Sequence, residues 1–191
     1  MNARISGPTA PDQLTLRQPV RRDGAALHAL VAACPPLDLN SRYAYLLFCH
    51  HHATTTVVAE SDGQIVGAIT AYVPPAQPDT LFIWQVAVAP HMQGQGLGAR
   101  MLDHLGRQWL AQRQLRWLET TISPGNGPSQ KLFTSFARRH GVGCTTSTLF
   151  SAGDFGESDH EEECLYKIGP WDHAVRLQDT LHLSSHTQGE T

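Results

Sequence analysis

The feature that most constrains this chain is an apolar segment that leads directly into a glycine-rich turn. Residues 80–89 (TLFIWQVAVA) are almost continuously apolar, and Pro90 ends the run. Such a run predicts a central β-strand covered on both faces, because a strand with one solvated face alternates apolar and polar residues. Residues 93–98 (QGQGLG) follow, and residues 98–112 then place apolar side chains at helical spacing. The predicted order is strand, turn and amphipathic helix.

A turn of this kind is suited to a phosphate group. Glycines let the backbone approach a pyrophosphate, and the first N–H groups of a helix have no acceptor within the helix. The helix dipole also favours negative charge there. A Rossmann site would instead place the turn after the first strand, with an acidic residue about 20 positions later. An ordinary strand-to-helix connection without a ligand stays open as an alternative.

The rest of the chain predicts an α+β (mixed α/β) fold. A strand at 14–18 precedes a helix that begins at a capping Asp23 and stops before Pro35, and Ser41 can cap a second helix from Tyr43. Asp62-Gly63 predicts a β-hairpin. Further helices are expected at 98–112 and 127–140, and further strands at 115–122, 143–150 and 163–168. Together these elements predict one central mixed, mostly antiparallel sheet of about seven strands, flanked by about four helices.

Length and composition favour a single domain. The 191 residues are 41% hydrophobic and 16% charged, which is typical of a globular protein. We expect a flexible N-terminus at 1–13, one domain at 14–170 and a flexible tail at 171–191. The net charge of −3 argues against nucleic acid as a partner. Neither a membrane span nor a secretory signal is recognisable, so a cytoplasmic protein is expected.

Cysteine and histidine usage does not predict a metal or a disulfide framework. The four cysteines lack a CxxC pair, so they are interpreted as reduced thiols. His50, His51 and His52 are consecutive, and neighbouring residues on a helix point about 100° apart, so the three rings cannot converge on one ion. We interpret them as a polar end of the second helix, and we expect no metal.

Two motifs resemble the Gcn5-related N-acetyltransferase (GNAT) superfamily. Val86-Ala-Val-Ala-Pro, Gln93, Gly96 and Gly98 match a strand ending near V-A-V-x-P that runs into Q/R-x-x-G-x-G/A. Residues 126–133 (NGPSQKLF) resemble the second motif of that superfamily, in which an Asn begins the helix that flanks coenzyme A. The resemblance implies a GNAT fold over 14–170 and acetyl-CoA as cosubstrate. The residues that it implies at the cofactor are Val86, Val88, Gln93, Gly94, Gly96, Gly98, Ala99, Asn126 and Phe133.

The same resemblance implies roles for several of these groups. The N–H groups around Gly94, Gly96 and Gly98 would hold the pyrophosphate, Val88 would pair with pantetheine, and the Val86 N–H would receive the thioester oxygen. Phe133 departs from the pattern, because many members have a Tyr there that protonates the departing thiolate. Solvent or another donor must then supply that proton.

Longer segments look like the L-2,4-diaminobutyrate acetyltransferases of ectoine biosynthesis. The similarity covers roughly 14–170 and is carried by residues 35–60, 82–102, 118–133 and 160–168. It implies transfer of acetyl to the side-chain amine of L-2,4-diaminobutyrate, giving the N4-acetyl compound from which the compatible solute ectoine forms in osmoadaptation. It also implies a homodimer.

Polar residues in hydrophobic contexts are the candidates for the acceptor site. Carboxylates can hold the two ammonium groups of a diamino acid, and the rings of Tyr43 and Trp84 can pack on an ammonium. An attacking amine must first lose a proton, for which Glu163 is favoured as base, then Glu119, with His160 also possible. The substrate-binding candidates are Asp38, Asn40, Tyr43, Trp84, Glu119, Thr121, His160 and Glu163.

Structural explanations stay open for most of these candidates. Asp38 could cap the second helix, Trp84 could belong to the core, and residues 161–163 could form a solvated turn beside a surface His160. Two other functions also stay open: acetylation of a protein or peptide amine, and a non-catalytic sensor of acyl-CoA.

Overall fold

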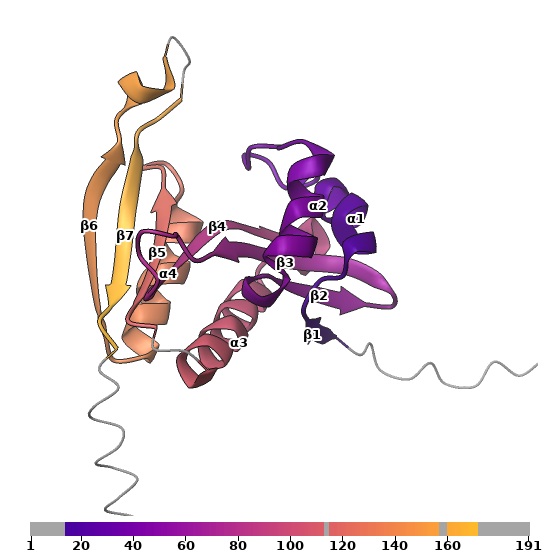
Figure 1. The fold of residues 1–191 in the computed structure, drawn as a ribbon. Helices are drawn as coiled ribbons and strands as arrows, with labels where there is room; N and C mark the ends of the chain where they lie inside the picture. The colour runs from indigo at the N-terminus through magenta and orange to yellow at the C-terminus, as the bar shows by residue number, and fades with distance from the viewer. Residues whose placement is uncertain (1–13, 113–114, 157–159, 172–191) are drawn as a thin grey trace, which may run out of the picture. The chain divides into compact units, whose positions relative to one another are not determined.

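The computed structural model describes residues 14–112, 115–156 and 160–171, and the side chains of 110–112 are not described. Within these ranges the chain forms seven strands and four α-helices (Figure 1). The strands are β1 Thr15–Arg17, β2 Val57–Ser61, β3 Gln64–Tyr72, β4 Thr80–Val88, β5 Trp117–Ile122, β6 Gly143–Phe150 and β7 Glu163–Gly169. The helices are α1 Gly24–Ala32, α2 Arg42–His51, α3 Leu97–Gln112 and α4 Gly127–Arg139, with short 3-10 turns η1 Arg21–Asp23, η2 Ala53–Thr55, η3 Pro90–Met92 and η4 Ala152–Phe155. The predicted mixed α+β class is confirmed.

The strands form one hydrogen-bonded sheet in the order β1-β2-β3-β4-β5-β7-β6. Strand β4 runs parallel to β5, whereas the pairs β1–β2, β2–β3, β5–β7 and β6–β7 are antiparallel. The apolar run that predicted a central strand is β4, fourth of the seven, and each of its residues is buried or half-buried. That prediction is confirmed.

The described chain divides into two compact units. The first contains residues 14–70 and 85–101, and the second contains residues 71–84, 102–112, 115–156 and 160–171. Strand β4 and helix α3 each contribute residues to both units. A single domain over 14–170 stays a prediction.

One predicted boundary needs correction. Trp171, assigned from the sequence to the flexible tail, is only 6% exposed, and its N–H donates to the Arg116 carbonyl at 3.0 Å. Its ring also meets that of Phe136 edge-on, with centroids 6.2 Å apart. Burial of a large indole against a helix stabilises this position, so Trp171 belongs to the packed part of the chain. Residues 1–13 and 172–191, for which flexible ends are predicted, lie outside the described residues.

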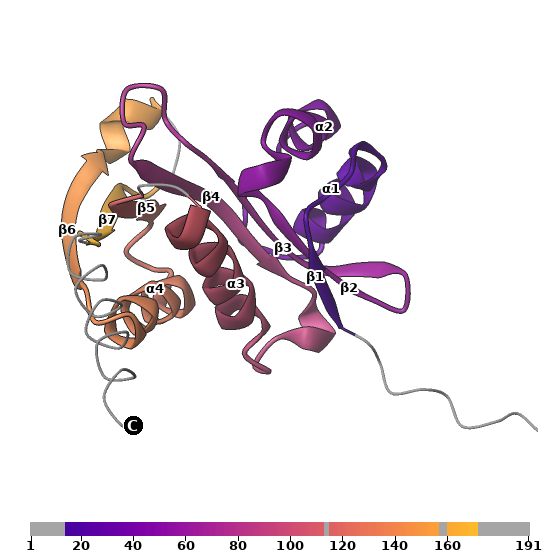
Figure 2. The ribbon, with the colours of Figure 1, turned by 60° about the horizontal axis from the view of Figure 1, so that its bottom comes forward.

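In the first unit, helices α1 and α2 lie side by side over strands β2 and β3 (Figure 2). Leu27 of α1, Tyr45 of α2 and Ile69 of β3 are each 0% exposed and form part of its core. The predicted hairpin is confirmed, because Asp62 and Gly63 have φ values of 50° and 74° between β2 and β3. Two consecutive left-handed residues are what a two-residue hairpin turn of type I′ requires.

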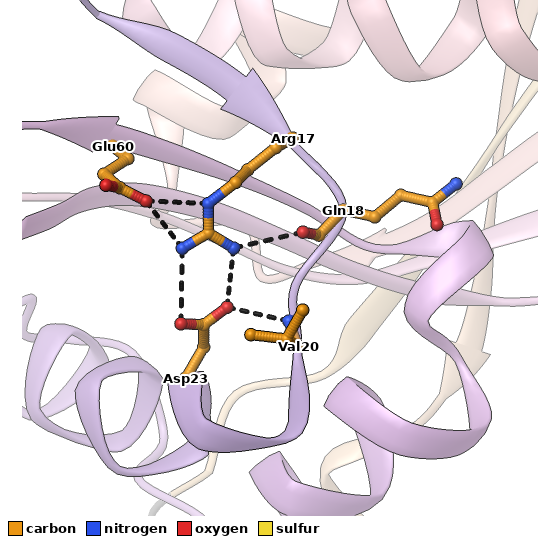
Figure 3. Close-up of polar contacts among 5 residues, drawn as sticks. All are labelled: Arg17, Gln18, Val20, Asp23 and Glu60. Atoms are coloured by element: carbon orange, nitrogen blue, oxygen red, sulfur yellow. Dashed lines mark hydrogen bonds and ion pairs between the residues drawn. The ribbon is translucent and has the colours of Figure 1, made fainter. Parts of the chain in front are cut away.

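An ion-pair network joins β1, η1 and β2 in this unit (Figure 3). The Arg17 Nε donates to Glu60 Oε2 at 2.7 Å, and its Nη1 donates to Asp23 Oδ2 at 2.7 Å. The Val20 N–H also donates to Asp23 Oδ2, at 2.8 Å. The prediction that Asp23 caps α1 is therefore wrong: its side chain makes no capping hydrogen bond, because the carboxylate accepts from Arg17 and Val20 instead.

The second unit is built around strands β5, β7 and β6, with α4 packed against β6 and β7. Phe133 and Phe136 of α4 are 2% and 0% exposed, and Ile168 of β7 is 0% exposed. Figure 1 shows β6 and β7 as a long hairpin that ends in η4. Strand β6 lies at the end of the sheet, and its residues are exposed or half-buried.

Among the described residues, the helices are too short or too polar to cross a bilayer. All four cysteines are free thiols, as expected from their spacing. Burial raises the pKa of Cys49 to about 11, and it also raises the pKa of Cys34 and Cys144.

The network around Asp23 predicts an acid-dependent loss of stability. Burial alone would raise the pKa of Asp23, but the hydrogen bonds from Arg17 and Val20 outweigh it and hold that pKa below its usual range. A carboxyl with a depressed folded pKa contributes full stability above its unfolded pKa of about 3.9. The contribution is lost as the pH falls through the lower folded pKa.

We therefore expect Asp23→Asn to lower the free energy of unfolding by about 2 kcal/mol at pH 7, with a smaller difference near pH 2. Urea unfolding across this pH range measures the effect. Asp62→Asn, which removes an exposed carboxylate at the hairpin turn, is the control. A pH-independent difference between wild type and Asp23→Asn would contradict the assignment.

Candidate functional site

The glycine-rich turn has an open, left-handed backbone. Gly94 and Gly96 have φ values of 75° and 76°, which residues with a Cβ rarely adopt. Nothing lies within 4 Å of the position that a Cβ would take at either glycine. Helix α3 begins at Leu97, one residue earlier than predicted, and its first hydrogen bond runs from Arg100 N–H to Gly96 O at 3.0 Å.

The chemistry of this turn fits a diphosphate. By helix geometry the N–H groups of Leu97, Gly98 and Ala99 have no acceptor within α3, and the helix dipole is positive at this end. Gly94 and Gly96 leave space in which an anion can approach the backbone. These residues can hold the pyrophosphate of a coenzyme, so the predicted role of the turn has a physical basis.

The end of strand β4 makes its own polar contacts. Its pairing with β5 covers Thr80–Ile83, so Val86 and Val88 lie beyond that register. The Val88 carbonyl accepts from the Gln93 side-chain amide at 3.0 Å and from the Cys34 thiol at 3.2 Å. A carbonyl oxygen has two lone pairs, and these two donors occupy both of them at Val88. The predicted pairing of Val88 with pantetheine therefore requires the Val88 N–H, or the displacement of Gln93 or Cys34 from the carbonyl. Burial raises the pKa of Cys34, which keeps this thiol protonated as a donor.

Three acceptor-site candidates lie in the first unit, around the start of α2. Asp38 is exposed, Asn40 is half-buried, and Tyr43 is 68% exposed. Ser41 caps α2, because its Oγ accepts from the Ala44 N–H at 3.2 Å. This confirms Ser41 as the cap and excludes that role for Asp38. Tyr43 is too exposed to be a core residue.

Glu119 lies in the second unit, in a partly buried ion pair that sequence reasoning missed. Its Oε1 accepts from the Lys167 Nζ at 2.6 Å, and its side chain is 7% exposed. The Lys167 ammonium also lies 4.4 Å from the centroid of the Trp117 ring. Glu119 and Lys167 face each other across the antiparallel pair β5–β7. Any substrate ammonium at Glu119 must compete with the Lys167 ammonium. The predicted roles of Glu119, in substrate binding and as a possible base, therefore require that Lys167 gives way.

Glu163 lies where β7 begins, beside the end of β5. Its Oε1 accepts from the Ser123 hydroxyl at 3.0 Å. Two residues earlier, Glu161 Oε2 accepts from the Gly125 N–H at 3.0 Å. Both carboxylates therefore contact the loop that leads into α4. The alternative that residues 161–163 form only a solvated turn does not fit these contacts.

His160 has a defined hydrogen bond that limits its chemistry. Its Nδ1 lies 2.7 Å from the Glu161 carbonyl oxygen, and its ring stacks on Phe155 at 4.0 Å. A carbonyl oxygen can only accept, so Nδ1 carries the proton and the lone pair of the neutral ring is on Nε2. His160 thus presents Nε2 as its basic atom.

The other candidates occupy defined positions in the second unit. Trp84 is half-buried in β4, so it belongs neither to the fully buried core nor to the exposed surface. Thr121 is half-buried in β5, opposite Leu165 of β7. Asn126 begins α4 as predicted, with its Oδ1 accepting from the Ser129 N–H at 3.1 Å. Phe133 is 2% exposed and carries no hydroxyl, so it belongs to the core and its contact with a cofactor stays a prediction.

A cavity of about 490 Å³ lies in the first unit. Its lining includes Arg17, Asp23, Leu30 and His91, and none of the predicted site residues. No cluster of three or more metal-binding side chains occurs among the residues whose placement is described.

The comparisons with known proteins agree with the motifs. The model of the acetyltransferase (GNAT) family matches residues 25–137. The chain is 48% identical over 171 residues to the L-2,4-diaminobutyric acid acetyltransferase of Bordetella parapertussis, a match that covers 88% of this chain and 91% of the relative. The enzyme of the same name from Streptomyces avermitilis is 48% identical, with 85% and 92% covered.

A solved structure extends this similarity to the fold. The diaminobutyrate acetyltransferase of Paenibacillus lautus, in complex with its substrate L-2,4-diaminobutyric acid and coenzyme A, matches with a TM-score of 0.79 at 38% identity. The match covers 83% of this chain and 96% of that chain. The chain therefore belongs to the acetyltransferase (GNAT) family and, within it, to the L-2,4-diaminobutyric acid acetyltransferases.

Proposed function

We propose that this protein transfers the acetyl group of acetyl-CoA to the side-chain amine of L-2,4-diaminobutyrate. The product is N4-acetyl-L-2,4-diaminobutyrate, the precursor of ectoine, and we place the reaction in the cytoplasm. The observation that carries the proposal is the similarity to the Paenibacillus lautus enzyme, whose structure holds both L-2,4-diaminobutyric acid and coenzyme A. The open, glycine-rich turn at the start of α3 supports the cofactor half of this proposal.

The residues of this chain supply the groups that direct acetyl transfer needs. The amine must be deprotonated before it attacks the thioester carbonyl, since an alkylammonium has a pKa of about 10 and no lone pair. Glu163 is our proposed base, because it accepts a hydrogen bond from the neutral Ser123, whereas Glu119 is already paired with the cationic Lys167. The Val86 N–H donates to the thioester oxygen as negative charge develops there. Phe133 has no proton to give, so solvent protonates the departing thiolate.

A thiol-release assay with a panel of amines tests this function. We expect release of coenzyme A with L-2,4-diaminobutyrate and much slower release with ornithine, lysine, spermine or a short peptide. NMR of the product should place the acetyl group on the side-chain nitrogen. Reaction with peptide alone would favour a protein acetyltransferase, and binding of acetyl-CoA without any release would favour a sensor.

The glycine-rich turn provides a test of the cofactor site. Gly96→Glu places a carboxylate where we expect the diphosphate, and repulsion between like charges should weaken acetyl-CoA binding by about 100-fold or more. Calorimetric titration with acetyl-CoA measures this. Gly63→Glu is the matched control, since Gly63 has nearly the same φ (74° against 76°) and equally open space at its Cβ position. Equal affinity of Gly96→Glu and wild type would remove the turn from the cofactor site.

The proposed base provides a second test. Glu163→Gln keeps an oxygen that can accept from Ser123 but cannot take a proton, so kcat/KM for diaminobutyrate should fall about 100-fold at neutral pH. Raising the pH should recover part of this loss, because more of the free amine is then present. Glu162→Gln removes a carboxylate from the same segment and serves as the control. A loss of activity that stays constant with pH would argue against Glu163 as base.

We also propose that the enzyme is a homodimer, as the family resemblance implies. Exposed apolar side chains on the β6–β7 hairpin support a contact there: Leu149 is 44%, Phe150 46% and Phe155 37% exposed. Light scattering should give twice the chain mass of 20.9 kDa. Phe150→Asp should shift the mass towards that of one chain, and a wild-type mass of 20.9 kDa would refute the dimer.

A further inference from the structure

A buried relay of hydrogen bonds in the first unit joins α2, β4 and the loop between α1 and α2. The Tyr45 hydroxyl donates to Gln85 Oε1 at 3.1 Å, and Gln85 Nε2 donates to the backbone carbonyl of Asp38 at 2.7 Å. Tyr45 is 0% exposed and Gln85 is 9% exposed. Gln85 is thus a polar residue between apolar neighbours in the strand, and both its amide oxygen and its amide nitrogen make hydrogen bonds.

The direction of these bonds fixes the backbone of the loop. The Asp38 carbonyl can only accept, so the Gln85 amide turns its NH₂ towards Asp38 and its oxygen towards the Tyr45 hydroxyl, which donates to it. The Asn40 N–H in turn donates to the Tyr45 hydroxyl oxygen at 3.4 Å. The relay therefore holds the loop at two positions. Gln85 of β4 holds the Asp38 carbonyl, and Tyr45 of α2 holds the Asn40 N–H.

Burial of apolar side chains contributes little to this part of the loop. Leu39 is 50% exposed, and Asp38 is also exposed. At the start of the loop, the Cys34 thiol donates to the Val88 carbonyl of β4 at 3.2 Å. The Cys34 thiol and the backbone groups of residues 38 and 40 thus set where the loop lies relative to the end of β4 in this unit.

This relay concerns the acceptor site because the loop that it holds, and the strand that it starts from, both contain candidate site residues. The loop holds Asp38 and Asn40, two of the candidates for binding the diamino acid, while Gln85 stands between Trp84 and Val86 in the strand. We propose that Gln85 and Tyr45 are positioning residues that hold Asp38 and Asn40 for diaminobutyrate without touching it. The inference rests on the proposed function and adds two residues to it.

The test separates positioning of the acceptor from general stability. Tyr45→Phe removes only the hydroxyl, and Gln85→Met removes both hydrogen bonds at similar volume. Each should raise the KM for diaminobutyrate about five- to ten-fold, as expected for the loss of one or two buried hydrogen bonds. The KM for acetyl-CoA should stay within about two-fold, because the relay does not involve residues 93–99.

Two control variants show whether a rise in the KM for diaminobutyrate comes from loss of this relay. Thr55→Val removes another hydrogen bond of the first unit, from Thr55 Oγ1 to the His52 carbonyl at 2.9 Å, and should leave both KM values unchanged. The double variant Tyr45→Phe/Gln85→Met should raise the KM by less than the product of the two single effects, because both variants remove the same Tyr45–Gln85 hydrogen bond. Tyr45→Phe alone decides the question if Gln85→Met does not fold.

The outcomes for the two proposals differ. The positioning role alone would be overturned if the wild-type enzyme is active on diaminobutyrate but Tyr45→Phe and Gln85→Met leave the KM for diaminobutyrate unchanged. It would also be overturned if they raise the KM for diaminobutyrate and the KM for acetyl-CoA equally. Wild-type protein without diaminobutyrate-dependent thiol release would overturn the proposed function and this inference with it.

Discussion

The hydrogen bonding of strand β4 is the constraint on which the rest of the structure depends. Its first four residues pair in parallel with β5, and the Ala89 N–H that follows it donates to Val66 of β3 at 2.9 Å. Buried backbone groups must find partners, and at the Val88 carbonyl these include two side chains. Gln93 and Cys34 donate to the Val88 carbonyl, so the glycine-rich turn and the loop after α1 are both tied to the same residue.

The carboxylates of Asp23, Glu119 and Glu163 differ in whether their hydrogen-bond donor is a cation. Asp23 and Glu119 each accept from a cation, Arg17 and Lys167 respectively, and both carboxylates are nearly buried. Breaking such a pair leaves a buried charge without compensation, which gives these residues a structural role. Glu163 accepts from the neutral hydroxyl of Ser123, and this difference is why we propose Glu163 rather than Glu119 as the base.

Local patterns were sufficient for most elements and for the cofactor motif. The β4 run, the Asp62-Gly63 hairpin and the Ser41 and Asn126 caps depend on residues close in sequence, so the sequence predicted them. Asp23 was misassigned because its partner Arg17 lies on another element and competes with the helix end. Trp171 was misassigned because its burial depends on Phe136 and Arg116, which are distant in the chain.

The sequence by itself determined the fold class, the family and the turn that suits a diphosphate, because these depend on short spacings and on backbone preferences of glycine. Only the tertiary structure decided which candidate polar groups are engaged and by what. Lys167 lies 48 residues from Glu119, and Gln85 lies 47 residues from Asp38. Contacts of this range follow from strand register and from the packing of α2 on the sheet, which a linear pattern does not contain.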